Sequence, residues 1–169
     1  HYRDRRQRQM CIRDRSTSSR ATLGGMTGNN SCGARSIRYG KMVDNVLGIE
    51  ALLQNGEKIQ FGEVDPKSLN GKHPSTRDHL LQQLFQIGIR EADEVRQRFP
   101  EVQRRVGGYN IDELIPPDHG VLNPARLLVG SEGTLAFSTS IHLKLQPIPT
   151  HKVLGVCHFP SFYEAMDST

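Results

Sequence analysis

Tryptophan is absent from this 169-residue sequence, cysteine occurs only three times, and no long run of apolar residues is present. No window approaches about eighteen consecutive apolar residues, so the chain is predicted to contain no integral membrane segment. Cys11, Cys32 and Cys157 lie far apart, with neither a CxxC pair nor histidines at zinc-finger spacing. This pattern predicts neither a disulfide framework nor a metal site, and it favours a reducing, cytoplasmic location.

Outside residues 1–15, the formal charges of the chain sum to zero. Residues 1–15 contain six Arg and two Asp, a balance of +4 that equals the formal net charge of the whole sequence. The sequence pI of about 9.2 therefore reflects one short segment and not a basic face on a folded domain. A length of 169 residues and a hydrophobic fraction of 36% suit one domain or most of two. We expect no nucleic acid partner for the body of the protein.

Residues 1–15 show no helical or strand period. The run MCIRDRS resembles translated sequencing-adapter read-through, and a non-native segment is the interpretation that we favour; a disordered basic tail and a phosphate-binding arm are the alternatives. The sequence does not begin with Met, and residues 160–169 are predicted to be only the opening of a helix. We therefore expect this chain to be a fragment of a longer protein.

Local signals predict a hairpin followed by a helix. Two apolar runs in residues 46–61 are joined by Asn55-Gly56, a pair that favours a tight turn. Residues 66–74 are predicted as a loop. A helix then begins after Ser75, breaks near Gly88 and ends before Pro100. Its apolar stripe consists of Leu80, Leu81, Leu84 and Phe85, continued by Val95 and Phe99.

The remainder of the chain is predicted to be irregular, with short strands. Residues 101–124 are expected to be irregular, residues 126–129 to form a buried strand and GSEGT to form a turn. The alternation of apolar and polar residues from Ile141 to Gln146 predicts a half-buried strand, and residues 152–159 are strand-like. One long helix among unevenly spaced strands indicates an α+β fold and not a regular βαβ array.

Two glycine-rich segments are candidates for a ligand site. Residues 21–41 read ATLGGMTGNNSCGARSIRYGK, and residues 130–137 read GSEGTLAF. Backbone without Cβ atoms can lie against a planar ring, and its N–H groups can point at phosphate oxygens. Neither the Rossmann nor the P-loop fingerprint is present, so an ordinary tight loop is an equal alternative on glycine content alone.

The order of four motifs carries a resemblance that no single motif does. GGMTGNNSCGARSIRYGK, DNVLGIEALLQNGE, RRVGGYNIDEL and NPARLLVGSEGTLAF together resemble the FAD-binding domain of the vanillyl-alcohol oxidase and p-cresol methylhydroxylase (PCMH) type. Within it, the chain is most similar to FAD-linked D-2-hydroxyacid dehydrogenases, the D-lactate and D-2-hydroxyglutarate class, with a fused iron–sulfur module. The similarity runs from about Ser19 to the end. It implies the second subdomain of a PCMH-type domain, α+β, with a mixed or antiparallel sheet flanked by helices.

This resemblance also implies a division of the chain and a set of cofactor contacts. It places the C-terminal part of the FAD-binding domain in residues 16–150 and the start of a substrate domain in residues 151–169. An N-terminal subdomain with a Pro-Gly-Gly phosphate loop is expected upstream. The two glycine-rich segments should face one another across a slot for the flavin. The implied cofactor-binding residues are Gly24, Gly25, Asn29, Asn30, Cys32, Gly33, Glu132, Gly133, Thr134 and Leu135.

Several other residues could have either a functional or a purely structural role. Cys32 could be a thiol near the flavin, although packing of a small residue is favoured. Tyr109 and Asn110 could edge the active site or anchor an irregular loop. Arg104-Arg105 could bind a carboxylate or phosphates, although solvated arginine is commoner. The histidines show no metal spacing, and no residue of this chain is predicted to be catalytic.

The function implied is that of an FAD-dependent dehydrogenase which oxidises a D-2-hydroxy acid, D-lactate or D-2-hydroxyglutarate, by hydride transfer to flavin N5. Any iron–sulfur cluster is expected only downstream of this chain, and the electron acceptor stays open. The alternatives are a non-redox flavin-binding scaffold of the same fold and a nucleic-acid-binding protein that uses residues 1–15. A cytoplasmic location is expected, with peripheral association with the inner membrane as an alternative. The isolated 169-residue chain is expected to bind FAD poorly.

Overall fold

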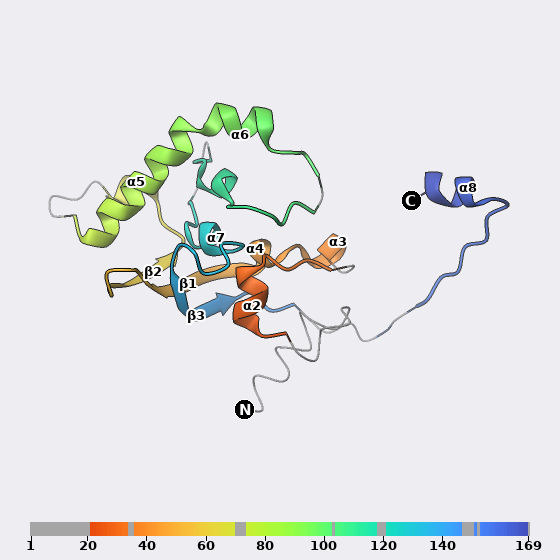
Figure 1. Ribbon diagram of the computed structural model, residues 1–169, viewed down its shortest axis with the longest axis horizontal. Coiled ribbons are helices and arrows are strands. Elements are labelled where there is room, and N and C mark those ends of the chain that lie inside the picture. Colours follow the sequence, from red (N-terminus) through yellow and green to blue (C-terminus); the bar gives the residue numbers. More distant parts are fainter. Residues whose placement is uncertain are drawn as a thin grey trace.

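The computed structural model describes residues 21–33, 36–69, 74–102, 104–117, 121–146, 151 and 153–168, so the predicted tail at residues 1–15 lies outside the described part. At its centre is an antiparallel three-stranded sheet in the order β2-β1-β3 (Figure 1). The strands are β1 (Val46–Leu52), β2 (Lys58–Gly62) and β3 (Phe137–Leu143). Helices accompany this sheet, which confirms the predicted α+β class and an antiparallel sheet.

The hairpin between β1 and β2 forms where it was predicted. Leu52 pairs with Lys58, and the turn between the strands contains Gly56 at φ +82°. The Asn55 side-chain oxygen accepts a hydrogen bond from the Glu57 N–H at 3.0 Å. Asparagine and glycine therefore supply the local hydrogen bond and the left-handed backbone that the turn needs.

Strand β3 pairs with β1 although most of the chain separates them. Ile141 lies opposite Ile49 and Phe137 opposite Leu52, and the register shifts between Val46 and Gly48 and between Glu50 and Ala51. The strand begins at Phe137 and ends at Leu143, earlier at both ends than the alternating pattern predicted. The core lies on one face of the sheet, where these side chains are buried: Val46, Ile49, Ala51, Ile59 and Phe61.

The predicted long helix is two helices, α5 (Thr76–Arg90) and α6 (Ala92–Arg98). Ser75 and Asp78 form the capping box at the start, and Leu81 and Phe85 of the apolar stripe are buried. The break lies at Glu91 and not at Gly88, which is an ordinary helical residue. A Cβ at Gly88 would lie 2.0 Å from the Leu114 carbonyl oxygen, so glycine permits close packing there instead of ending the helix.

The predicted strand at residues 126–129 is wrong. The chain forms the single-turn helix α7 (Ala125–Leu128), in which Leu127 and Leu128 are buried. Pro124, with φ −64°, sets the backbone for a helical turn, and the Asn123 side chain accepts a hydrogen bond from the Ala125 N–H at 3.1 Å. A short apolar run fits a buried helix as well as a buried strand, and here the preceding Asn-Pro decides between them.

Three segments predicted as loops or as irregular contain short helices. The first glycine-rich segment forms α2 (Leu23–Gly28) and α3 (Ser36–Tyr39), and α4 (Met42–Asn45) directly follows it. Pro66–Leu69 is the 3₁₀ helix η1, within the loop predicted at 66–74, and Ile111–Leu114 is the 3₁₀ helix η2, within a segment predicted as irregular. Side-chain caps such as Thr22 offset the low helix propensity of the glycines.

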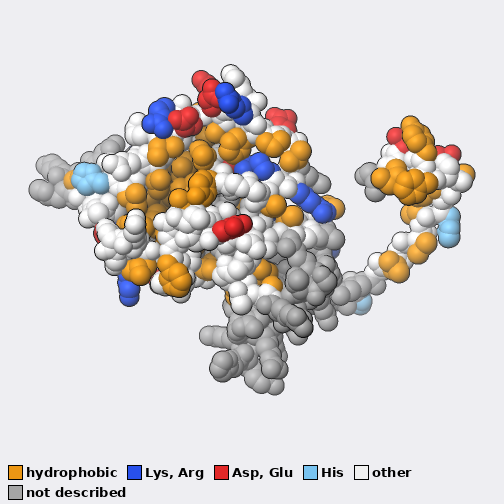
Figure 2. All heavy atoms as spheres, in the orientation of Figure 1, with side chains coloured by type: hydrophobic (Ala, Val, Ile, Leu, Met, Phe, Trp, Pro, Cys, Tyr) orange, Lys and Arg blue, Asp and Glu red, His pale blue; other side chains and the backbone are white. Residues whose placement is uncertain are grey.

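In the last described segment, residues 153–168, the predicted strand is absent and the predicted helix is present. Residues 153–159 were predicted to be strand-like, but they form no strand and are exposed; Lys152 lies outside the described part. The predicted helix is confirmed as α8 (Phe162–Asp167), capped by Ser161. In Figures 1 and 2 this segment extends away from the sheet, with apolar side chains on its surface. A strand needs a partner for its backbone groups, and none lies beside residues 153–159 within the described chain.

Candidate functional site

The two glycine-rich segments lie in direct contact, although about a hundred residues separate them. The Gly130 N–H donates to the Thr27 carbonyl oxygen at 2.9 Å, and the Glu132 N–H donates to the Gly28 carbonyl oxygen at 3.0 Å. A Cβ at Gly28 would lie 3.7 Å from Glu132 Cα. The expected meeting of the two segments is therefore present, but they join edge to edge and not across a slot.

The second segment is a turn with three left-handed residues. Gly130, Glu132 and Gly133 have φ values of +84°, +52° and +80°. The buried Ser131 donates its hydroxyl to the Leu128 carbonyl oxygen at 2.8 Å, and the Thr134 hydroxyl donates to the Ser131 carbonyl oxygen at 2.6 Å. These side-chain bonds hold the backbone of the turn in a conformation that favours glycine.

Most of the backbone donors in the two segments already have partners inside the fold. The Gly25 N–H donates to Thr22 Oγ1, and the Gly33 N–H donates to Ser36 Oγ. The N–H groups of Asn29, Asn30, Glu132 and Thr134 donate to backbone carbonyl oxygens of these same segments. The segments therefore offer mainly flat backbone for van der Waals contact and fewer donors for phosphate oxygens than the glycine content suggested.

Asn30 lies at the junction of the segments and is fully buried. Its φ of +44° is unusual for a residue with a Cβ. The side-chain oxygen accepts a hydrogen bond from the Val43 N–H at 3.0 Å, and a Cβ at Gly130 would lie 3.2 Å from Asn30 Cβ. The other end, Nδ2, is a buried donor without a partner in the described chain.

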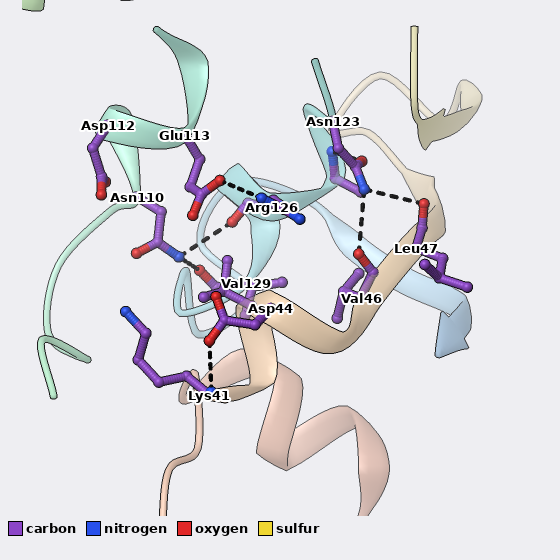
Figure 3. A network of polar contacts seen from close by, with 12 residues as sticks. Lys41, Asp44, Val46, Leu47, Asn110, Asp112, Glu113, Asn123, Arg126 and Val129 are labelled. Atoms are coloured by element: carbon purple, nitrogen blue, oxygen red, sulfur yellow. Dashed lines mark hydrogen bonds and ion pairs between the residues drawn. The ribbon is translucent and has the colours of Figure 1, made fainter. Parts of the chain in front are cut away.

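A third segment joins the site through residues 107–110. The Tyr109 hydroxyl lies 2.9 Å from Thr134 Oγ1. The buried Asn110 donates through Nδ2 to the Val129 carbonyl oxygen at 2.8 Å and to the Arg126 carbonyl oxygen at 3.2 Å (Figure 3). Asn110 therefore anchors the loop, and Tyr109 contacts the second glycine-rich segment through Thr134.

Two arginines near the site are paired with carboxylates of the same chain. Arg105 forms an ion pair with Asp112 and stacks over the Phe99 ring, 4.5 Å from its centroid. Arg126 pairs with Glu113 at 2.9 Å (Figure 3). These bonds assign Arg105 to holding η2 and the preceding loop together. Arg104 is the exposed member of the predicted pair.

The remaining candidates occupy exposed or half-buried positions. Cys32 is a free, half-buried thiol, and Asn29 is the exposed C-terminal cap of α2. No group of three His, Cys, Asp or Glu residues that could hold a metal ion is found in the described residues. No helix in that same part of the chain is long and apolar enough to cross a membrane.

Seven of the exposed residues of the two segments are here called the glycine-rich surface: Gly24, Gly25, Asn29, Glu132, Gly133, Thr134 and Leu135. At Gly24 and Gly133 an added Cβ would meet no described atom within 4 Å, so backbone is directly accessible at both positions. Just beneath, Asn30 Nδ2 is a donor without a partner in the described chain. Accessible flat backbone beside a spare donor fits a planar, polar cofactor such as FAD.

Comparison with known proteins also indicates an FAD-binding chain. Residues 5–62 match the FAD binding domain family. The chain is 35% identical over 156 residues to a D-2-hydroxyglutarate dehydrogenase of Pantoea ananatis and 33% identical over 153 residues to that of Escherichia coli. These alignments cover 90% and 89% of this chain. A mitochondrial D-lactate dehydrogenase of Arabidopsis thaliana is 29% identical over 147 residues, 87% of this chain.

These similarities confirm the resemblance expected from the sequence and support FAD as the cofactor. The chain spans only about 15% of the length of the two bacterial relatives and 17% of the Arabidopsis protein. The family match begins at residue 5 and ends at residue 62, before the second glycine-rich segment. The predicted domain boundaries and the ten predicted cofactor contacts therefore stay predictions.

Proposed function

We propose that this chain, as a relative of the D-2-hydroxy acid dehydrogenases, supplies part of the FAD site of an enzyme that oxidises a D-2-hydroxy acid. The observation that carries the proposal is the direct pairing of the two glycine-rich segments through Thr27, Gly28, Gly130 and Glu132. It joins two glycine-rich segments in a chain that is similar to such dehydrogenases along nearly its whole length.

In this proposal the chain's residues bind and orient the cofactor. Gly24 and Gly133 admit it close to backbone, because neither position carries a Cβ. Asn30 holds the first segment against α4 through its bond with the Val43 N–H, and its buried Nδ2 has no partner in the described chain. Leu135, 38% exposed, adds apolar contact that excludes water from one side.

When bound, FAD would supply a two-electron acceptor, at N5, for the oxidation of the substrate α-carbon. We assign no proton-transfer group and no substrate-carboxylate clamp to the described residues. Arg105 and Arg126, the half-buried cations nearby, are already paired with Asp112 and Glu113. The residues that act on substrate are proposed to lie outside this chain, and so is any iron–sulfur cluster.

The test is anaerobic reduction of the complete gene product that contains this chain. After purification, the cofactor is released by acid and identified by chromatography, and the holoprotein is then mixed with D-2-hydroxyglutarate, D-lactate or their L enantiomers. The proposal expects bound FAD whose visible absorbance bleaches with a D enantiomer and not with its L enantiomer. Absence of FAD would contradict the proposal. Bound FAD that no D-2-hydroxy acid reduces would leave the non-redox scaffold as the better account.

A further inference from the structure

Tyr109 borders the glycine-rich surface, with its hydroxyl hydrogen-bonded and much of the residue exposed. Its hydroxyl is bonded to Thr134, 2.9 Å away, while 43% of the residue stays exposed. A tyrosine that serves only to anchor a loop gains most by burying its ring, because burial of the aromatic surface is the larger contribution. Here the polar end is fixed and the apolar ring is left accessible.

The backbone around Tyr109 carries few side chains. At Gly107 and Gly108 an added Cβ would meet no described atom within 4 Å, and Gly108 has φ +79°. Across the contact with Thr134 lie Gly133, equally open, and the exposed Leu135. The tyrosine ring therefore lies beside a flat stretch of accessible backbone.

The ring is also held in place before any ligand binds. The Thr134 hydroxyl hydrogen is used in the bond to the Ser131 carbonyl oxygen, so the Tyr109 hydroxyl is the donor to Thr134 Oγ1. The next residue, Asn110, is fixed by its bond to Val129 (Figure 3). A side chain that is already ordered loses little entropy when a ligand stacks on it.

From this geometry we infer that Tyr109 is a ligand-contacting residue, whose ring stacks against a planar heteroaromatic ring of FAD. The inference rests on the proposed function and adds a contact from a segment outside the two glycine-rich ones. Stacked aromatic pairs prefer offset, face-on contact, which an exposed ring beside side-chain-free backbone permits. Both the isoalloxazine and the adenine ring have the required chemistry.

The test compares two changes at Tyr109 in the flavin-free complete gene product, by calorimetric titration with FAD. Tyr109→Phe keeps the ring and removes the hydroxyl, and it is expected to bind FAD within about threefold of the wild type. Tyr109→Leu keeps apolar bulk and removes the ring, and it is expected to weaken FAD binding about tenfold. Titrations with FMN and with ADP then show which ring is stacked, since only that probe is weakened by Tyr109→Leu.

Several results would overturn the inference. If Tyr109→Phe weakens FAD binding as much as Tyr109→Leu does, Tyr109 is only a loop anchor. Unchanged binding by Tyr109→Leu refutes the contact while leaving the proposed function intact, whereas a wild type that binds neither FAD, FMN nor ADP refutes the proposed function itself. Ile89→Ala, at an exposed apolar residue of α5 outside the glycine-rich surface, is the control and should bind as the wild type does. Should circular dichroism show that Tyr109→Leu is unfolded, Tyr109→Met makes the same comparison.

Discussion

Among the residues that the structure describes, two with a Cβ have left-handed backbone, and both lie where the glycine-rich segments meet. Asn30 is buried at φ +44°, and Glu132 is exposed at φ +52°. Asparagine tolerates this region better than most residues, and its amide bonds to the Val43 N–H, which explains its position. Glu132 has neither advantage, so its backbone conformation is set by the bond between its N–H and Gly28.

Replacement of Asn30 by glycine separates the effect of its left-handed backbone from that of its side-chain bond to the Val43 N–H. Asn30→Gly suits the positive φ but leaves the buried Val43 N–H without its acceptor, so we expect the free energy of unfolding to fall by about 1–3 kcal/mol. Glu132→Gly relieves the same backbone conformation at an exposed site and should leave stability unchanged or raise it by up to about 1 kcal/mol. Urea unfolding of the flavin-free protein measures both. Equal stability of Asn30→Gly and wild type would show that the Asn30 amide does not hold the segments together.

Gly88 illustrates how one residue determines the approach of two elements. A Cβ at this position would lie 2.0 Å from the Leu114 carbonyl oxygen, a backbone atom that cannot move without η2. Gly88→Ala is therefore expected to cost about 3 kcal/mol or more, despite the better helix propensity of alanine. The adjacent, exposed Ile89→Ala is the control and should change stability little. Thermal unfolding checks both, and a Gly88→Ala variant as stable as wild type would contradict the packing described.

At the scale of elements, the start of α5 shows how a cap links stability to pH. Hydrogen bonds from the Ser75 N–H and hydroxyl lower the pKa of Asp78 from its ordinary value of 3.8. Because the folded pKa lies below the unfolded one, the carboxylate stabilises the fold at pH values above 3.8, and this contribution is lost as the pH falls toward the folded pKa.

Asp78→Asn is the variant that tests this linkage. We expect it to be less stable than wild type near neutral pH and to approach the stability of wild type as the pH falls below 3.8, in unfolding curves recorded along a pH series. Glu94→Gln, on the exposed face of α6, is a matched loss of charge in an exposed ion pair and should show a smaller effect. A constant difference between Asp78→Asn and wild type at all pH values would contradict the account.

Elements with a chemical signal at their ends could be predicted from the sequence, and elements defined by packing could not. Asn55-Gly56 fixed the hairpin, and Ser75 with Asp78 fixed the start of α5. The run at 126–129 was too short for a period to distinguish strand from helix, and α7 resulted. Residues 153–159 have strand-like composition, but strand formation depends on a partner that composition does not reveal.

At the scale of the whole molecule, the candidate site depends on contacts between segments that are distant in sequence. Glycine content alone left the first segment equally consistent with a plain loop, and only the order of four motifs indicated a flavin site. The sequence could not show that most backbone donors would be used inside the fold, because those bonds depend on α2 and on Ser36. The role of Tyr109 could not be decided from the sequence either, because its contact with Thr134 joins residues that are 25 positions apart.

The exposed C-terminal segment is the part of the molecule that the described contacts explain least. Val153, Leu154, Phe162 and Tyr163 are all largely exposed, and apolar side chains cover α8 in Figure 2. Such a cluster is typical of a surface that packs against other protein. The relatives are several times longer than this chain, so the complete gene product is the proper material for the binding experiments.

The most direct test of the account is FAD titration of Gly24→Ala. A Cβ at Gly24 meets no described atom, so the flavin-free protein should be as stable as wild type or up to about 1 kcal/mol more stable. If FAD lies against this backbone, its Kd should rise about tenfold or more, while Gly62→Ala on β2, the control, should leave it unchanged. A Gly24→Ala protein that binds FAD as tightly as wild type would contradict the claim that the glycine-rich surface holds the cofactor.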